Sequence, residues 1–390
     1  MSFTAGLYCA ESDRLYPVEP DRYVCEESLR PLIAVYDYQA LSEAVDPDRF
    51  EQSSERLMSR FAPLLPFRDA ASLNHLDLPE TPVTMVHPEK NEPPIFWKDE
   101  SELPTGSTWA RSTAVLQGLM QEWERSRALF TNPGPAGCSL ASSLDDTEQF
   151  VLVVPEQFRK YLDTFPEALP RLVVTDSSPR QLNEYVVGEL SQQQWYFAVP
   201  GWNPHLLEGL KTVAFELFHQ LESQSGTVYV SGLSELPARA LIKGFVELEK
   251  LGWIDSRPRV VRVRTKDPSK LAGRMKSNGR QIPDIFFEED VFFPDVGPAV
   301  DETLLVESEV IETVIESVPD DHPVLESPTG LLGIAGCQTD GDPQKPQTVL
   351  DCGLGPIEPH GTDDRQAPVN ETTMNDLTDT LNQLQVKQGG

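Results

Sequence analysis

Short apolar segments and helical stripes alternate through the middle of this chain, and their order limits the folds that it can adopt. The strand-like segments are apolar runs of a few residues: 93–99, 127–131, 149–155, 171–176, 195–199, 227–232 and 259–265. The helical segments repeat apolar residues every three or four positions: 108–126, 178–193, 206–221 and 238–251. Strands and helices that alternate with such short connections form right-handed crossovers and a largely parallel sheet. The sequence therefore predicts an α/β fold.

The charge of the chain narrows the partners that it can have. The 390 residues include 62 acidic and 32 basic ones, which gives a net charge of −30. Nucleic acids and anionic membranes attract clustered Lys and Arg, so we expect neither as a main partner. No apolar run approaches 18 residues, the N-terminus lacks the features of a secretory signal, and the five cysteines are scattered. We therefore expect a cytoplasmic protein without disulfides.

The acidic residues concentrate toward the C-terminus. Residues 281–390 hold 23 acidic and 3 basic residues, and residues 281–330 contain no Lys or Arg. Past residue 336 the sequence is rich in Gly, Pro, Asp, Gln and Thr, which predicts a disordered acidic tail over 336–390. A short amphipathic helix is predicted near 372–386, with four apolar residues on one face: Met374, Leu377, Leu381 and Leu384. This helix either frays in water or docks into the groove of a protein partner.

Several segments occur in the order typical of one enzyme family. They are "SLNHLDLPETPV" (72–83), "WKDESELPTGSTWARS" (97–112), "NPHLLEGLKTVAFEL" (203–217) and "LIKGFVELEKLGWIDSRPRVVRVR" (241–264). Together they resemble threonine synthase and, more broadly, the tryptophan-synthase-β-like enzymes, which are fold type II pyridoxal-phosphate enzymes. The resemblance implies a two-domain, three-layer fold with mostly parallel sheets. It places a larger α/β domain at 60–105 and 200–335, a smaller one at 106–199 and a zinc-ribbon-like segment at 1–59.

The positions that bind the cofactor in this family have changed. The resemblance places Trp109 at the Schiff-base lysine, and an indole cannot form an imine. The family's Ser and Arg on either side remain as Ser107 and Arg111. Pro135, after Gly134, stands where an Asn contacts the cofactor ring, and proline offers no donor.

The family's phosphate loop and zinc ligands have also changed. The loop corresponds to "SGLSELP" (231–237), which keeps Gly232 but adds Glu235, a carboxylate that would repel phosphate. The zinc ribbon of the family has two Cys-x-x-Cys pairs, and here each pair keeps one thiol: Cys9 with Ser12, and Cys25 with Ser28. Two thiolates and two hydroxyls make a poor zinc site, so we expect no metal.

Other residues suggest little further chemistry. The six histidines show no metal-ligand spacing, and His205 and His219 are interpreted as surface or packing residues. A Schiff base relocated to Lys98 or Lys211 remains an alternative. The acidic runs at 286–293 and 301–317 are typical of solvated faces. The phenylalanines that flank the first run are candidates to anchor it on the core or on a partner: Phe286, Phe287, Phe292 and Phe293.

Three hypotheses for function follow from these losses. The first is a catalytically inactive pseudoenzyme that acts as a protein-binding scaffold or regulator, without cofactor, and uses its acidic tail as a binding arm. The second is a pyridoxal-phosphate-dependent lyase or synthase of altered chemistry in amino-acid metabolism. The third is a sensor that binds a small metabolite in the residual cleft. A homodimer is compatible with each of them.

Overall fold

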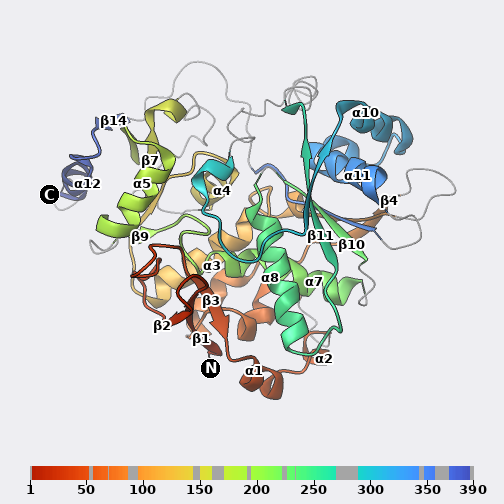
Figure 1. The fold of residues 1–390 in the computed structure, drawn as a ribbon, viewed down its shortest axis with the longest axis horizontal. Coiled ribbons are helices and arrows are strands. Elements are labelled where there is room, and N and C mark those ends of the chain that lie inside the picture. The colour runs from red at the N-terminus through yellow and green to blue at the C-terminus, as the bar shows by residue number, and fades with distance from the viewer. Residues whose placement is uncertain are drawn as a thin grey trace.

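Two largely parallel sheets and one small antiparallel sheet form the framework of the molecule (Figure 1). The computed structural model describes the following residues: 2–51, 56–68, 70–86, 95–143, 150–159, 171–190, 195–221, 226–232, 234–268, 289–341, 347–355 and 369–386. No helix in these ranges is long and apolar enough to cross a membrane. The predicted α/β class, with mostly parallel sheets, is confirmed.

The larger sheet has six strands in the order β12-β11-β10-β13-β5-β4. Their bounds are β4 Val83–Val86, β5 Ile95–Asp99, β10 Thr227–Ser231, β11 Arg259–Thr265, β12 Glu302–Val306 and β13 Gln347–Asp351. All neighbours are parallel except β4, which pairs antiparallel with β5. Helices α7 (Thr212–Gln220) and α8 (Leu236–Lys250) pack on one face, and α10 (Ser308–Ser317) and α11 (Pro328–Asp340) on the other. Each face thus buries its own apolar core, which gives three layers.

The smaller sheet has five parallel strands in the order β14-β8-β7-β6-β9. Their bounds are β6 Ala128–Phe130, β7 Phe150–Pro155, β8 Arg171–Thr175, β9 Tyr196–Phe197 and β14 Val369–Thr372. The helices of this part are α3 Trp109–Glu122, α4 Pro135–Ser142, α5 Pro179–Tyr185, with a π-helical turn at Val186–Leu190, and α12 Leu377–Val386. Their apolar faces join the strands in one core cluster.

The N-terminal segment forms a separate small sheet in the order β2-β1-β3. Its antiparallel strands are β1 Thr4–Cys9, β2 Arg14–Tyr16 and β3 Ile33–Tyr36. Helices α1 (Tyr38–Ala44) and α2 (Asp48–Glu51) and the 3₁₀ helices η1 (Met58–Leu64) and η2 (Ala70–Leu76) lead from it to β4.

One predicted helix is divided in the structure. The stripe at 206–221 forms two helices, α6 (Leu207–Leu210) and α7, which meet at Lys211. A Cβ atom on Gly209 would lie 2.2 Å from the carbonyl oxygen of Arg111, so the two backbones touch at this point. Such a contact fixes the path of the chain between the two helices. Periodicity alone could not reveal it, because the apolar stripe continues through the break.

The prediction of a disordered tail over 336–390 is wrong for the described part of that range. Residues 336–341 end α11, and β13 lies between β10 and β5 with all five residues buried. A central strand takes its backbone hydrogen bonds from both neighbours, so a few apolar residues suffice to hold it. Residues 342–346, 356–368 and 387–390 lie outside the described residues.

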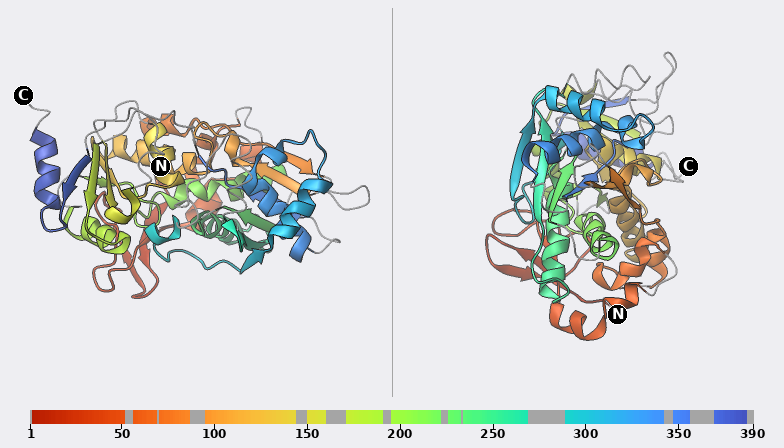
Figure 2. Two further views of the ribbon diagram at one scale, coloured as in Figure 1. Left: turned by 90° about the horizontal axis from the view of Figure 1, so that it is seen from above. Right: turned by 90° about the vertical axis from the view of Figure 1, so that its right-hand side faces the viewer.

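The predicted helix near 372–386 exists, but it packs on the chain's own core. Leu377 and Leu381 are fully buried, Leu384 is nearly so, and Met374 packs against the same cluster. Strand β14 pairs with β8, and α12 follows it at one end of the molecule (Figure 2). In this structure the four apolar residues are therefore not a free docking peptide, because the adjacent sheet edge already covers them.

Candidate functional site

The turn between β5 and α3 brings the chain to the position of the expected cofactor lysine. Gly106 has a φ of +68°, a left-handed conformation that glycine adopts without strain. Its carbonyl accepts a hydrogen bond from the amide of Gly355 at 2.9 Å, and Thr108 N donates to Cys352 O at 2.8 Å. The segment after β13 therefore fixes the turn, and Trp109 begins the helix that follows.

Trp109 is a core residue, with 3 % of its surface exposed. It lies in a small apolar cluster with residues from α4, α6, α8 and the segment after η9 (Glu289–Phe292): Ala136, Leu207, Leu210, Leu236, Ala240 and Val296. The ring of Phe293 packs on the indole, with 5.3 Å between the ring centroids and 31° between the planes. The space next to the expected imine position is filled by aromatic and aliphatic side chains.

Pro135 occupies the first turn of α4, and Gly134 precedes it as the N-cap residue. Proline suits the first turn of a helix, where an N–H would have no intrahelical partner. The amide of Gly134 donates to Asn132 Oδ1 at 2.5 Å. The side chain of Pro135 brings no polar group to this site.

The start of α8 carries charged residues that pair with one another. Glu235 accepts hydrogen bonds from Arg239 Nε at 2.6 Å and from Arg262 Nη1 at 3.2 Å. The amide of Glu235 donates to Asp290 Oδ1 at 2.8 Å, and Arg262 Nη2 donates to Asp290 Oδ2 at 2.5 Å. The carboxylates of Glu235 and Asp290 thus occupy the amide and guanidinium donors at this helix end, which a phosphate would need for binding.

The residues at this site do not fit pyridoxal phosphate. The cavity lined by Trp109, Ala136 and seven neighbours has a volume of about 10 Å³, which holds about one water molecule. Sites for small ligands have volumes of roughly 300–1,000 Å³. None of the nine lining residues carries an amine or a charge: Trp109, Ser112, Thr113, Leu116, Ala136, Leu140, Ala198, Pro200 and Leu206. Ser107, which the resemblance gives as a retained serine, is buried and forms an isolated β-bridge with Gly353.

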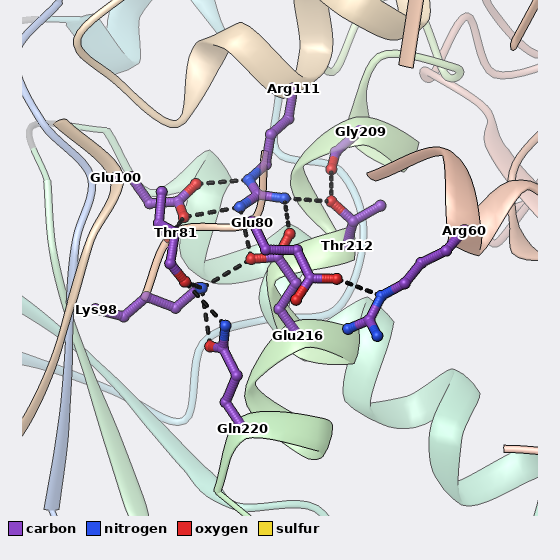
Figure 3. Close-up of polar contacts among 10 residues, drawn as sticks. All are labelled: Arg60, Glu80, Thr81, Lys98, Glu100, Arg111, Gly209, Thr212, Glu216 and Gln220. Atoms are coloured by element: carbon purple, nitrogen blue, oxygen red, sulfur yellow. Dashed lines mark hydrogen bonds and ion pairs between the residues drawn. The ribbon is translucent and has the colours of Figure 1, made fainter. Parts of the chain in front are cut away.

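Arg111 belongs to a buried ion network (Figure 3). Its guanidinium makes bidentate pairs with Glu100, at 2.6 and 2.8 Å, and with Glu216, at 2.5 and 2.9 Å. Burial raises the pKa of Glu100, but the charge and hydrogen bonds of Arg111 outweigh it and hold that pKa at about 2. All three side chains are fully buried. The network joins α3, α7 and the 3₁₀ turn η3 (Glu100–Glu102) that follows β5, so Arg111 has a structural role here.

Lys98 and Lys211 are also held in buried ion pairs. Lys98 Nζ donates to Glu216 Oε2 at 2.8 Å and to the carbonyl of Thr81 at 2.7 Å. Lys211 Nζ lies 2.5 Å from Glu208 Oε2 and 2.7 Å from Glu247 Oε2. Neither lysine lines the cavity beside Trp109. The structure therefore gives no support to a relocated Schiff base at either position.

The side chains at the four zinc-ribbon positions lie close together, and they form hydrogen bonds with one another. Ser12 Oγ and Tyr16 Oη lie 3.3 and 3.2 Å from Cys25 Sγ, and Ser28 Oγ lies 3.5 Å from Cys9 Sγ. Burial raises the pKa of Cys25, but hydrogen bonds from Ser12, Ser28 and Tyr16 outweigh it and lower that pKa to about 5. Structural zinc takes four Cys or His ligands, and two cysteine sulfurs with two serine hydroxyls do not supply them. The described residues include no group of three or more His, Cys, Asp or Glu that could hold a metal.

Sequence reasoning missed Asp290 as a site residue. The acidic run at 286–293 contains Asp290, but such a run is typical of a solvated face. No local pattern in the sequence indicates that Arg262 and α8 are its partners. Phe292 and Phe293 do anchor this segment on the core, in agreement with one of the two interpretations. Phe286 and Phe287 lie outside the described residues.

Two largely parallel sheets with helices packed on them define an α/β architecture. A family profile described as "Pyridoxal-phosphate dependent enzyme" matches residues 76–349. This chain therefore belongs to the family of pyridoxal-phosphate dependent enzymes.

Threonine synthases are among the similar proteins. The chain is 24 % identical to threonine synthase of Methanocaldococcus jannaschii over 282 residues, which cover 70 % of this chain and 69 % of that protein. It is 22 % identical to threonine synthase of Methanosarcina acetivorans, over 71 % and 68 % of the two chains. The structure of Escherichia coli threonine synthase matches with a TM-score of 0.54 and 13 % identity over 93 % of this chain and 95 % of that one. The structural likeness shows a shared fold.

Proposed function

We propose that this chain is a catalytically inactive, threonine-synthase-like protein that acts as a protein-binding scaffold or regulator. The packing of Phe293 on Trp109 carries the proposal, because it places two aromatic rings where the family's cofactor chemistry needs an amine and open space. Pro135 supplies no side-chain donor, and Glu235 and Asp290 place negative charge at the helix end. Several independent requirements for cofactor binding are lost together.

The other two hypotheses have weaker support. An enzyme of altered chemistry needs a reactive group in a cleft, and the residues beside Trp109 are apolar or hydroxylic. A metabolite sensor needs a pocket that is at least as large as its ligand, and the cavity here has a volume of about 10 Å³.

A cofactor assay tests the loss of activity. Purified protein titrated with pyridoxal phosphate is expected to show no yellow imine absorbance, and borohydride reduction with peptide mapping should find no pyridoxyl-lysine. Trp109→Lys restores the amine but not the phosphate site or the open space, so we expect it to show no threonine synthase activity. Pyridoxyl-lysine at any position of the wild-type chain would replace the proposal with the enzyme alternative.

The partner is proposed to be a basic protein. Residues 281–330 contain no Lys or Arg, and helix α10 exposes three glutamates along one face: Glu309, Glu312 and Glu316. Charge of one sign attracts and orients partners of the opposite sign, and salt screens this attraction. The acidic face of α10 now replaces the tail as the candidate binding surface, because α12 is packed on the core.

A pull-down with full-length protein tests this surface. Glu309→Gln/Glu312→Gln/Glu316→Gln is expected to lose partners that wild type captures at low salt and releases at high salt. The matched control is Glu11→Gln/Glu26→Gln/Glu27→Gln, which removes the same charge from the exposed loops between the N-terminal strands. Equal capture by both triple variants would contradict the proposed surface.

A further inference from the structure

Residues 290–297, which we name the latch segment, pass between the two parallel sheets. The segment begins within η9 and lies where α8, α5 and the first turn of α3 approach one another. Phe292 is fully buried and Val296 is 5 % exposed, whereas Val291 is 48 % exposed. The segment is thus anchored by Phe292 and Val296, with Phe293 partly buried between them.

One end of the latch segment is bound to the six-stranded sheet and its helix. Asp290 accepts hydrogen bonds from the amide of Glu235 at the start of α8 and from Arg262 on β11. At the other end, Asp295 pairs with Arg239 on α8, and Arg239 Nη1 also reaches the carbonyl of Gly297 at 3.5 Å. Negative side chains at a helix N-terminus stabilise it, so these contacts fix the segment on α8.

The middle of the latch segment is bound to the five-stranded part. The carbonyl of Phe292 accepts from Asn183 Nδ2 on α5 at 2.8 Å and from Trp202 Nε1 at 3.2 Å. The ring of Phe292 packs on Phe158, just after β7, with 4.8 Å between the centroids. Phe293 then contacts Trp109. It packs against the core of the five-stranded part and against the small apolar cluster around Trp109.

We propose that the latch segment is a built-in occupant of the former cofactor site, which joins the two sheets as a bound ligand would. A ligand that binds only the folded state stabilises it, and a covalently attached segment does so at all protein concentrations. Asp290 supplies the anion at the start of α8, and Phe293 supplies the ring beside Trp109. The inference rests on the proposed absence of cofactor.

Hydrogen exchange measured by mass spectrometry on the full chain tests the latch. Phe293→Ala is expected to speed amide exchange by about tenfold or more in two places, α5 and the first turn of α8, because the link between the sheets is loosened. Val291→Ala is the matched control, since it removes an exposed apolar side chain from the same segment. Faster exchange confined to residues near 293, or equal in both variants, would overturn the inference.

A second variant keeps the test open if Phe293→Ala does not fold. Asp290→Asn preserves shape but removes the charge that meets Arg262 and α8, and we expect faster exchange at α8 and at α5. Unchanged exchange at α5 would show that the segment does not couple the sheets. A failure of the proposed function gives a different signal, the imine absorbance of wild-type protein with pyridoxal phosphate.

Discussion

Trp109 is the residue of the candidate site whose packing the structure defines most directly. Trp109 takes the place of a lysine, and its indole joins the apolar cluster that includes Leu236 and Val296. Burial of a large side chain stabilises a fold by about 1.5–3 kcal/mol. The side chain of Trp109 is therefore expected to contribute to stability through packing.

Trp109→Ala is therefore expected to destabilise the fold by about 3–5 kcal/mol, because the lost burial leaves a cavity. Denaturant unfolding, followed by circular dichroism, measures the free energy of unfolding. Leu305→Ala, at a side chain that is 50 % exposed, serves as the control and should change it little. A loss below about 1 kcal/mol for Trp109→Ala would show that the indole is not a core residue.

The N-terminal segment brings its four zinc-ribbon positions close together. Ser12 and Ser28 contact the two thiols directly, so their β-carbons already converge. Ser12→Cys/Ser28→Cys restores four thiolates, and we expect it to bind about one zinc ion per chain. Elemental analysis, after incubation with zinc and dialysis to remove unbound metal, measures the zinc content per chain. Ser12→Cys alone is the control and should bind less, and a double variant without zinc would contradict the inferred geometry.

Among the elements, the C-terminal helix departs most from the sequence-based expectation. Helix α12 places Leu377 and Leu381 in the core of the five-stranded part, and its partner strand β14 extends the sheet edge at β8. An isolated helix of this length is marginal, but packing on a sheet stabilises it. The helix is thus an integral element of the fold.

Leu381→Ala is expected to lower the free energy of unfolding by about 2–5 kcal/mol, because Leu381 is fully buried. Gln383→Ala, on the exposed face of the same helix, is the matched control and should be nearly neutral. Thermal and denaturant unfolding of the full-length variants measure both. Equal stability of wild type and Leu381→Ala would restore the docking-peptide interpretation.

At the scale of the whole molecule, the buried ion network connects the segment after the N-terminal sheet to the six-stranded part. Glu80 pairs with Arg60 on η1 and faces Glu216 and Lys98 (Figure 3). Burial, and to a lesser extent the charge of Glu216, raises the pKa of Glu80 to about 7. The folded state therefore takes up a proton at Glu80 more readily than the unfolded chain.

This raised pKa sets the sign of a pH effect. The stabilising contribution of protonated Glu80 is complete below about pH 4.5, its ordinary pKa, and is lost as the pH rises through about 7. Between pH 5 and 8, wild type should lose on the order of 1–3 kcal/mol relative to Glu80→Gln. Urea unfolding at several pH values measures the difference. Glu11→Gln, which removes an exposed ion-pair partner of Arg30, is the control, and parallel curves for all three proteins would contradict the argument.

The pattern of apolar residues predicted the α/β class, which the structure confirms, and the resemblance assigned Trp109 to the position of the cofactor lysine. These features depend on local periodicity and on the chemistry of one residue type. The packing around Trp109 and the positions of the C-terminal residues became visible only in the folded chain. Asp290 meets Arg262, and β13 enters the centre of a sheet, through contacts between residues far apart in the chain. An acidic or Gly-rich composition describes the solvation of an isolated segment, but its neighbours decide whether it is buried.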